Sequence, residues 1–591
     1  MTTKRRQGFF QPKTLAIAIA LGTAAPAYAV TFNIGEIEGQ FDSALSVGAS
    51  WAMDDPDMDL VGSANGGTGY TQTGDDGRLN FKKGETFSKI FKGVHDLELR
   101  YGDSGAFIRG KYWYDFELKD ESRLFKDISD SNRKEAAQSS GAKILDAFLY
   151  HNYYLGDLPG TVRIGRQVVS WGESTFIGNS INAINPLDAA AFRRPGAEIK
   201  EGLIPVNMLY VSQSLTDQLS MEAFYQLEWD QTIVDNCGTF FAGADVVADG
   251  CDMNYNILDE ATVNTLLAIP APARAALGIN VEEEGLLVRR GGDRDARDSG
   301  QYGVAFRWLA DAAEYGVYFM NYHSRTPNLS MRNANAAAIT AALRTPALAS
   351  PILLSNGEYF LEYPEDIRLY GASFATTLPT GTAWSGEISY RPNMPVQINT
   401  TDMTGRLVRT VVGAAAVGGA PAALAQAGAE SRGYNRKEVT QLQTTFTHFI
   451  DQVLGAGRVT LVGEIGYTHV GGLESKSELR YGRDSIYGLD TPEYGNDGFT
   501  TANSWGYRLR ALANYSNVFA GINLTPNVSF SHDVDGYGPV FNEGSKAVSI
   551  GVDAEYQNTY TAGLSYTDFF GGDYNTLTDR DFLAFSVGVN F

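Results

Sequence analysis

Few residues in this chain are spaced for catalysis. Gly102-Asp103-Ser104-Gly105 matches the order of residues around the nucleophile of a serine protease. Such a serine needs a histidine as its general base, and the sequence offers no paired histidine for Ser104. Asp, Ser and Gly are also common in tight turns, because they suit local hydrogen bonds and positive φ angles. We therefore interpret this motif as a turn between two strands.

The potential metal ligands are scattered. Asp54, Asp55, Asp57 and Asp59 offer the oxygen ligands that Ca²⁺ prefers, but they lack the glycine turn and closing glutamate of a calcium loop. We interpret them as a solvated surface that meets lipopolysaccharide through shared divalent ions. The histidines show no metal-ligand spacing; they are His95, His151, His323, His448, His469 and His532. We expect no metal, no cofactor and no enzymatic activity.

The two cysteines, Cys237 and Cys251, lie close together in one segment. No histidine is near them, so a metal site is not expected. An even number of cysteines in an exported chain favours a disulfide. Closing a loop of this size stabilises the folded state by roughly 3 kcal/mol in the chain-entropy model.

The segment between Gly165 and Leu215 combines aromatic residues, Asn, Pro and balanced charges. Long connections without regular structure are usually functional. We expect this one to fold inward and narrow a passage, and the alternative is an external cap. The candidate constriction residues are Glu173, Arg193, Arg194, Glu198, Lys200 and Glu201.

The elements that would position these residues are strands with apolar and polar positions in alternation. The pattern predicts about eighteen strands, joined by connections that are short and long in turn, as in a transmembrane antiparallel β-barrel. The predicted ranges are 41–53, 89–101, 106–118, 143–155, 160–170, 203–213, 218–229, 301–310, 314–323, 366–376, 381–391, 437–449, 457–470, 503–515, 519–531, 545–556, 558–568 and 580–591. Pro526 falls inside one of them and is the place where the pattern is weakest.

Charged residues on these strands must face the lumen, because an Arg or Lys facing lipid costs roughly 2–4 kcal/mol at the bilayer midplane. The candidate lumen-lining residues are Arg109, Lys111, Asp115, Glu117, Arg163, Arg508 and Arg510. A barrel of this size is wide enough for an aqueous lumen unless something fills it.

Three long loops contain apolar stretches that predict short helices: 262–277, 334–354 and 407–429. Apolar helices in exposed loops need a partner. They either pack on one another and cap the barrel or form a collecting surface for an apolar solute, and both can hold at once.

Both ends of the chain indicate export to an outer membrane. Residues 1–29 contain a basic leader, a short apolar run and an Ala-Tyr-Ala cleavage site, which predict a secretory signal peptide. Its removal leaves a single barrel domain, residues 30–591, and lowers the net charge from −22 to −26, which argues against nucleic-acid binding. No later run of eighteen apolar residues predicts a membrane-spanning helix. The final strand alternates strictly and ends on Phe591, similar to the insertion signal of outer-membrane barrels.

Several motifs resemble a proteobacterial outer-membrane family known as domain of unknown function 1302. They are Leu79-Asn80-Phe81, Phe91-Lys92-Gly93, Gly165-Arg166-Gln167-Val168-Val169-Ser170-Trp171-Gly172-Glu173, Asn185-Pro186-Leu187-Asp188 and Pro205-Val206-Asn207-Met208. The resemblance runs over nearly the whole mature chain. It implies an outer-membrane barrel that handles hydrophobic compounds together with periplasmic and inner-membrane partners, and it supplies no site residues.

The favoured function is an outer-membrane channel or transporter for a hydrophobic or amphipathic small molecule. One alternative is a general or charge-selective porin, since opposed charges in a lumen select ions. Another is a plugged barrel with a structural or assembly role. The expected partners are outer-membrane lipid, lipopolysaccharide and the barrel insertion machinery.

Overall fold

The computed structural model describes residues 30–74, 76–489 and 491–591. The predicted signal peptide, residues 1–29, lies outside the described residues.

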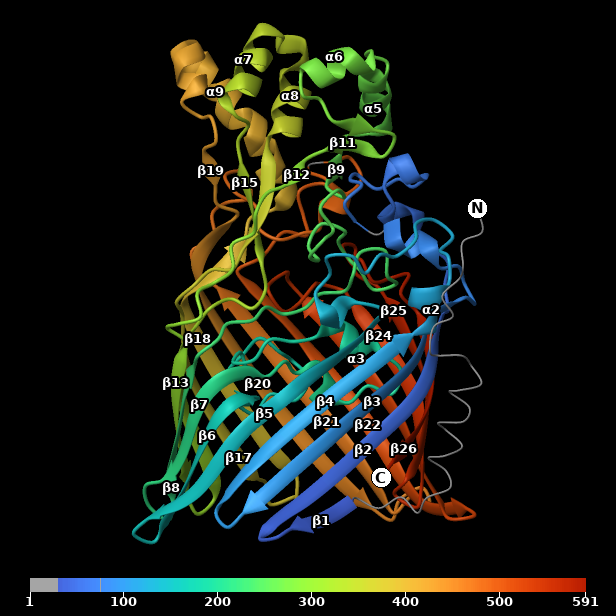
Figure 1. The fold of residues 1–591 in the computed structure, drawn as a ribbon, viewed down its shortest axis with the longest axis vertical. Helices are drawn as coiled ribbons and strands as arrows, with labels where there is room; N and C mark the ends of the chain where they lie inside the picture. The colour runs from blue at the N-terminus through green and yellow to red at the C-terminus, as the bar shows by residue number, and fades with distance from the viewer. Residues whose placement is uncertain (1–29, 75, 490) are drawn as a thin grey trace.

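Eighteen antiparallel strands close into a barrel (Figure 1) because β26 pairs with β2. This confirms the predicted fold, and each predicted strand is found within a few residues of its expected place. The barrel strands are β2 (Ile37–Ala52), β3 (Thr86–Tyr101), β4 (Ser104–Asp115), β5 (Ser140–Leu155), β6 (Leu158–Gln167), β7 (Val206–Ser214), β8 (Leu219–Gln226), β13 (Tyr302–Leu309), β14 (Ala313–Tyr322), β17 (Ile367–Thr377), β18 (Ala383–Gln397), β20 (Tyr434–Asp451), β21 (Arg458–Val470), β22 (Asn503–Phe519), β23 (Ile522–Asp535), β24 (Lys546–Tyr556), β25 (Tyr560–Phe570) and β26 (Phe582–Asn590).

The two ends of the barrel differ. Short turns join the strands at the lower end in Figure 1, which we call the turn end, and long connections rise from the upper end, which we call the loop end. The short strand β1 (Val30–Ile34) pairs with the start of β2 at the turn end. The chain finishes at the same end, where Ser43 and Phe591 exchange two backbone hydrogen bonds of 2.6 and 2.9 Å.

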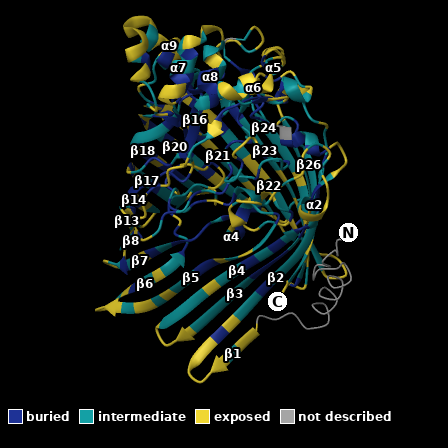
Figure 2. Cartoon of the chain, turned by 45° about the horizontal axis from the view of Figure 1, so that its top comes forward, coloured by how far each residue is buried: buried dark blue, intermediate teal, exposed yellow. Residues whose placement is uncertain are grey.

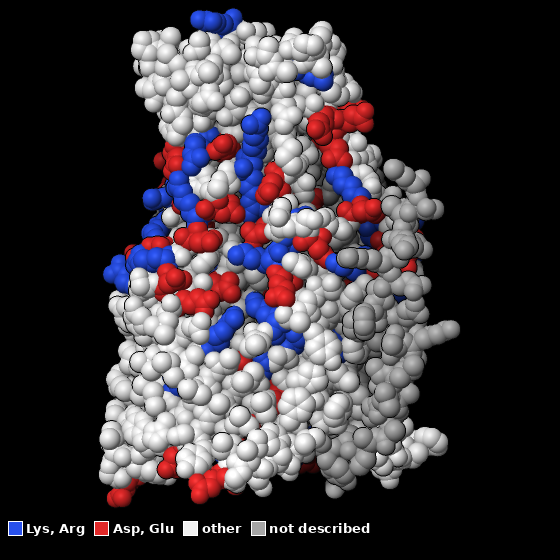
Figure 3. All heavy atoms as spheres, in the orientation of Figure 1, with Lys and Arg blue, Asp and Glu red and all other residues white. Residues whose placement is uncertain are grey.

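Apolar side chains point outward along the strands, and polar ones point inward. On β22, Leu509 is exposed on the outer surface while the neighbouring Arg508 turns inward to an ion pair with Asp533. Exposed outward positions alternate with covered inward ones along many strands (Figure 2). On the face in Figure 3, the lower half carries few charged side chains, and a band of mixed charge begins above it. This uncharged outer band has the character of a lipid-facing wall.

Two local departures from the predicted strands have clear causes. The strand predicted to reach residue 118 ends at Asp115, whose side chain accepts the backbone N–H groups of Glu117 and Leu118 and caps the helix α2 (Phe116–Asp120). Pro526 does lie within β23, and the pairing of β23 with β22 is interrupted beside it, between Asn527 and Leu524, without a change of register. Proline has no N–H to donate to that ladder.

A helical cap stands above the loop end (Figure 1) and has its own apolar core, formed by residues such as Ile339, Leu353 and Leu407. The helices predicted in three loops are present, and they pack on one another. The cap contains α5 (Glu260–Leu267), α6 (Ala271–Ala276), α7 (Ala336–Arg344), α8 (Ala349–Asn356) and α9 (Thr400–Leu424), with the short strands β9 (Asn256–Ile257), β10 (Val281–Glu282), β11 (Gly285–Leu287), β12 (Arg289–Arg290), β15 (Asn328–Arg332), β16 (Glu358–Glu362) and β19 (Glu430–Ser431).

The helix α9 bears on the expectation that no later segment spans a membrane as a helix. By length and composition, α9 is apolar enough to cross a membrane. One such helix is weak evidence of a span, and here α9 packs against α7 and α8 in the cap. It is also kinked at Gly419, two residues before Pro421.

Candidate functional site: a folded segment inside the barrel

The connection between β6 and β7, residues 168–205, folds into the barrel instead of rising above it. Its first part packs against the inner wall in an apolar cluster in which Trp171 and Ile181 contact Phe224, Tyr318 and neighbouring side chains of the wall strands. The Trp171 indole also donates a 2.7 Å hydrogen bond to Glu222 on β8. We call residues 168–205 the lumen segment.

Glu464 on β21 binds the backbone of the lumen segment. Its carboxylate accepts the N–H groups of Thr175, Phe176 and Ile177 at 3.0, 2.6 and 2.7 Å, and the Thr445 hydroxyl at 3.1 Å. The Glu464 side chain is fully buried, with 0% exposure. Three successive N–H groups make a concave donor site for an anion. These N–H groups therefore stabilise the buried negative charge of Glu464, which would otherwise need a cation as its partner.

A second wall carboxylate, Glu387 on β18, binds the same part of the segment. It accepts the backbone N–H groups of Glu173 and Ile181 at 2.5 and 3.3 Å. The guanidinium of Arg391, also on β18, donates to the carbonyl oxygens of Asn179 and Ser180 at 2.7 and 2.6 Å. The first part of the segment is thus fixed to β18 and β21 through main-chain groups.

The second part of the segment is fixed to the opposite side of the barrel by lysines. Lys111 on β4 pairs with Asp188 at 2.7 Å, and Lys92 on β3 pairs with Glu201 at 2.5 Å. Lys92 also donates to the Gly196 carbonyl at 2.7 Å. All four charged groups are almost fully buried, so each pair neutralises charges that would be costly to bury alone.

Short helices shape this second part. Asp188 caps α3 (Ala189–Arg193) by accepting the Ala191 N–H, and α4 (Ile199–Gly202) begins with a capping box between Glu198 and Glu201.

Position 48 on β2 requires glycine, because the lumen segment approaches the wall closely there. A Cβ there would lie 2.5 Å from the Pro195 ring of the lumen segment.

The six candidate constriction residues do not form one ring. Glu201 is buried against Lys92, whereas Glu198 and Lys200 pair with each other at 3.0 Å and border open space. Arg194 stacks over the Trp113 ring at 4.6 Å. The remaining two, Arg193 and Glu173, lie apart: Arg193 reaches up to Asp235 in a long loop at 2.5 Å, and Glu173 lies at the Glu387 anchor.

The candidate lumen-lining residues are also divided. Arg109 pairs with Asp96 and Asp146 on the inner wall at 2.7 and 3.4 Å, and Arg163 lies over the Tyr210 ring at 4.1 Å. Lys111 and Arg508 make the inward ion pairs described above, and Arg510 on the same face of β22 is exposed. Asp115 is buried at the loop-end rim, where it accepts the Ser88 hydroxyl.

Glu117 departs from the predicted pattern. It lies in α2 at the rim and pairs with Lys89 and Arg123 at 2.6 and 2.8 Å. Its placement as a strand residue facing the lumen was wrong, because β4 ends two residues earlier at its helix cap.

Two connected cavities remain beside the lumen segment, with volumes of about 390 and 290 Å³. Both lie against β2, β3 and the C-terminal strands of the barrel. Their charged lining residues are Asp42, Lys92, Asp96, Glu198, Lys200, Glu201, Asp553 and Glu555. Carboxylates outnumber amines in this lining. The space beside these strands is therefore acidic, while the first part of the lumen segment packs on the wall at β8, β14, β18 and β21.

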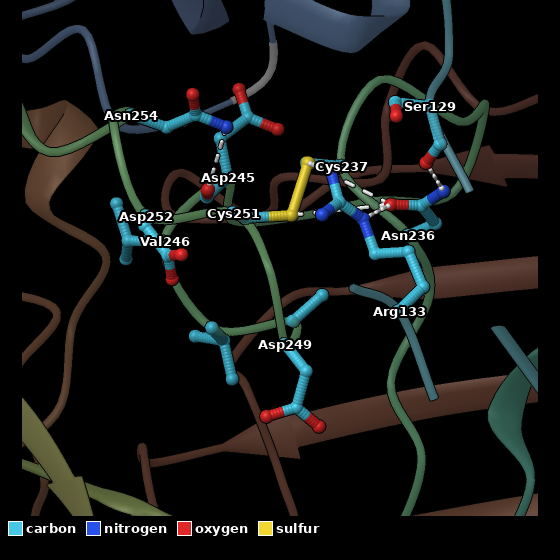
Figure 4. Close-up of a disulfide and its surroundings, with 12 residues drawn as sticks. Ser129, Arg133, Asn236, Cys237, Asp245, Val246, Asp249, Cys251, Asp252 and Asn254 are labelled. Atoms are coloured by element: carbon cyan, nitrogen blue, oxygen red, sulfur yellow. Dashed lines mark hydrogen bonds between the residues drawn. A yellow bond between two sulfur atoms is a disulfide. The ribbon is translucent and has the colours of Figure 1, made fainter. Parts of the chain in front are cut away.

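The disulfide between Cys237 and Cys251 is formed, with Cα atoms 6.5 Å apart. Figure 4 shows Arg133 beside it, donating to the Cys237 sulfur at 3.2 Å and to Asn236. This loop lies directly over α3, because Asp235 is the partner of Arg193. Burial raises the pKa of the Asp235 carboxyl above its ordinary value.

One judgement about Ser104 needs correction. The ring of His151, its partner on β5, lies beside it, with Nδ1 2.9 Å from the Ser104 hydroxyl. The sequence did not indicate this pair, because Ser104 and His151 are far apart in the chain and are brought together only by the register of β4 and β5. Among the described residues, no hydrogen bond is made to the other ring nitrogen of His151, and no group of three or more His, Cys, Asp or Glu is placed to hold a metal.

Sequence reasoning missed the anchors on the wall: Glu387, Glu464, Arg391 and Lys92. The available signal was their position, since each is a charged residue at an inward-facing place on a strand. Nothing in the sequence paired them with a segment up to 289 residues away.

Comparison with solved structures finds chains of low sequence identity that match over most of their length. They include OccK1 (OpdK) of Pseudomonas aeruginosa, with 10% identity, 94% of this chain and 98% of that chain covered and a TM-score of 0.40. OccAB1 of Acinetobacter baumannii has 10% identity, coverage of 96% and 98% and a TM-score of 0.38. OmpF of Salmonella typhi has 10% identity, coverage of 95% and 100% and a TM-score of 0.33. These values say nothing about a solute.

No match was found among curated proteins. A family model described as "Protein of unknown function (DUF1302)" matches residues 11–591, in agreement with the resemblance drawn from the motifs. The chain belongs to this family.

Proposed function

We propose that this protein is an outer-membrane channel that passes an amphipathic small molecule along one side of its lumen. The observation that carries the proposal is the lumen segment, which is bonded to wall strands on both sides and borders cavities beside β2, β3 and the C-terminal strands. A general porin needs an open aqueous bore. A segment that is fixed to the wall on both sides narrows the bore and favours selective passage.

Exposed apolar side chains of the lumen segment support an amphipathic solute. Ile199 on α4 is 73% exposed within the barrel, and it stands between the charged residues Glu198 and Lys200. Phe192 and Leu187 of the lumen segment are also partly exposed. Apolar groups beside charges offer contacts to both parts of an amphipathic molecule. The cap adds apolar surface outside, where Val417 of α9 is 93% exposed.

The experiment removes residues 176–198, replaced by a short Gly-Ser linker, and measures single-channel conductance in planar bilayers. We expect a large rise in conductance with the barrel still folded, as judged by heat-modifiable migration on gels. The matched control removes residues 262–276 from the cap, which should leave conductance unchanged. An unchanged conductance in the folded 176–198 variant would contradict the proposal.

The same recording tests a charge-selective porin as the second candidate. The acidic lining of the cavities, which includes Asp42, Asp553 and Glu555, favours it. Charged rings in a pore select ions by sign. Large steady currents with cation preference in the unmodified protein would support the porin, whereas low current with solute-dependent uptake supports the selective channel.

The proposed location and orientation have their own test. With both chain ends in the periplasm, the loop end faces outside. Protease added to intact cells should then cut within residues 238–300 and leave the turn at residues 102–104 intact. Cleavage at that turn would invert the orientation.

A further inference from the structure

An aromatic belt surrounds part of the barrel near its loop end. Outward-facing rings follow one another across neighbouring strands, with Tyr302 opposite Tyr225 and Tyr370 opposite Tyr390 in strand register. Phe319 on β14 joins the two pairs, with ring centroids 6.2 Å from Tyr302 and 5.2 Å from Tyr370. Aromatic rings of this kind sit at the headgroup level of a membrane. The belt therefore marks the outer edge of the lipid-facing wall.

Three exposed arginines lie at the loop-end side of this belt. Arg368 is two residues from Tyr370 on β17, so its side chain is on the same outward face. On β20, Arg436 shares the outward face with Thr440, which lies opposite Tyr390. Arg432 comes just before β20 and lies over the Tyr434 ring at 5.3 Å. We call these three residues the arginine patch.

A bulge in β18 brings two of these arginines together. Asn393 lies in the bulge between Arg391 and Met394, and its side chain accepts the Arg368 N–H at 3.0 Å. The Arg436 guanidinium donates to the Asn393 carbonyl at 3.1 Å and to the Glu365 carbonyl at 2.6 Å. Asn393 thus contacts both the backbone of Arg368 and the guanidinium of Arg436, and the bulge supports the Arg436 side chain.

The arginine patch has an excess of positive charge. Among the described residues, none of its three side chains forms an ion pair with a carboxylate. The nearby carboxylates of Glu365 and Asp366 are already bound by Arg297. One exposed carboxylate, Glu438, shares the outward face of β20. Counting Arg297 with the two carboxylates that it binds, four arginines face three carboxylates, so one net positive charge remains.

We propose that the arginine patch binds the phosphate groups of a phosphorylated glycolipid in the outer leaflet. Guanidinium groups bind phosphate oxygens with paired hydrogen bonds, and this geometry suits arginine better than lysine. The aromatic belt next to the patch contacts the acyl part of the same molecule. This inference rests on the proposed outer-membrane location, and it is independent of what passes through the lumen.

The test measures binding of bisphosphorylated lipid A to the purified full-length barrel in detergent micelles. The variant is Arg368→Gln with Arg432→Gln, because neither side chain donates a hydrogen bond to a described residue and folding should be preserved. At roughly 1 kcal/mol for each arginine near an anionic surface, affinity should fall about thirtyfold. The matched control, Arg289→Gln with Arg344→Gln, removes the same charge from exposed positions in the cap and should bind normally.

Two further arms identify the ligand chemistry. Lipid A without its phosphates should bind both proteins equally weakly, and millimolar inorganic phosphate should not displace the bisphosphorylated lipid. Equal affinity of the double variant and the control would overturn the proposal, as would an equal loss with the phosphate-free lipid. Displacement by free phosphate would assign the patch to a soluble anion instead. This test measures lipid binding and not conductance, so its outcome does not depend on whether the channel proposal holds.

Discussion

Replacing Glu464 with alanine should release the lumen segment from the wall. The variant removes the acceptor for the backbone N–H groups of Thr175, Phe176 and Ile177, which lie at 3.0, 2.6 and 2.7 Å. A buried donor left unsatisfied costs about 1–3 kcal/mol. Water from the adjoining lumen can reach a loosened segment, so we take about 1 kcal/mol for each, or about 3 kcal/mol in all.

That free energy corresponds to a shift of about a hundredfold in the ratio of released to docked segment, since 1.4 kcal/mol is tenfold. Single-channel recording should therefore show large openings far more often than in the unmodified protein. Glu464→Gln keeps one carbonyl oxygen as an acceptor, so its effect should be smaller, about tenfold.

The matched control is Glu555→Ala. Glu555 is an exposed lumen carboxylate that borders the cavity and makes no hydrogen bond to the lumen segment among the described residues. It tests whether a change in lumen charge alone alters the openings. If Glu464→Ala folds normally and its openings match those of Glu555→Ala, the wall carboxylate does not hold the segment and the reasoning is refuted.

Three other perturbations test separate parts of the structure. Changing Cys237 and Cys251 to serine should cost the outer loops roughly 3 kcal/mol and speed their cleavage by added protease; equal cleavage rates would contradict this. Deleting Phe591 should lower the amount of barrel in the membrane while export across the inner membrane continues; normal assembly would remove the role assigned to this residue. Burial lowers the pKa of His323 below 6.5, so the neutral ring stabilises the fold above pH 6.5 and this stability is lost as the pH falls below it. Denaturant unfolding at two pH values should show the loss, and His323→Gln should weaken it; an equal pH dependence in both proteins would count against the role of this ring.

The strands were predictable because a membrane barrel imposes a rule at every position. Where a strand crosses the lipid, an outward residue is apolar or aromatic and an inward residue is free to be polar, so the alternation repeats from strand to strand. The residue at which a strand ends is harder to predict, as β4 shows. Asp115 continues the polar pattern of the strand, but its side chain caps the helix α2. A short polar side chain fits both an inward position of a strand and the N-cap of a helix, and only the backbone conformation distinguishes the two.

The lumen segment was predictable in place but not in mechanism. Its balanced charges and its apolar residues indicated an inward fold. The role of each charge depended on partners far away in the sequence, such as Lys92 for Glu201. Arg193, which has the same charge as its neighbour Arg194, points to a long loop through Asp235 while Arg194 stacks on Trp113. Residue type alone does not separate these two outcomes.

The way the first part of the segment is held leaves some of its side chains free for another role. The wall binds its first part mainly through main-chain groups, with N–H groups to Glu387 and Glu464 and carbonyl oxygens to Arg391. Main-chain bonds are the same whatever the side chain, so Phe176, which is only partly buried, is not needed for docking. A passage built in this way separates the strength of the segment's attachment from the chemistry of the surface that it presents. Different side chains on one anchored backbone would then suit different solutes without any change in the barrel.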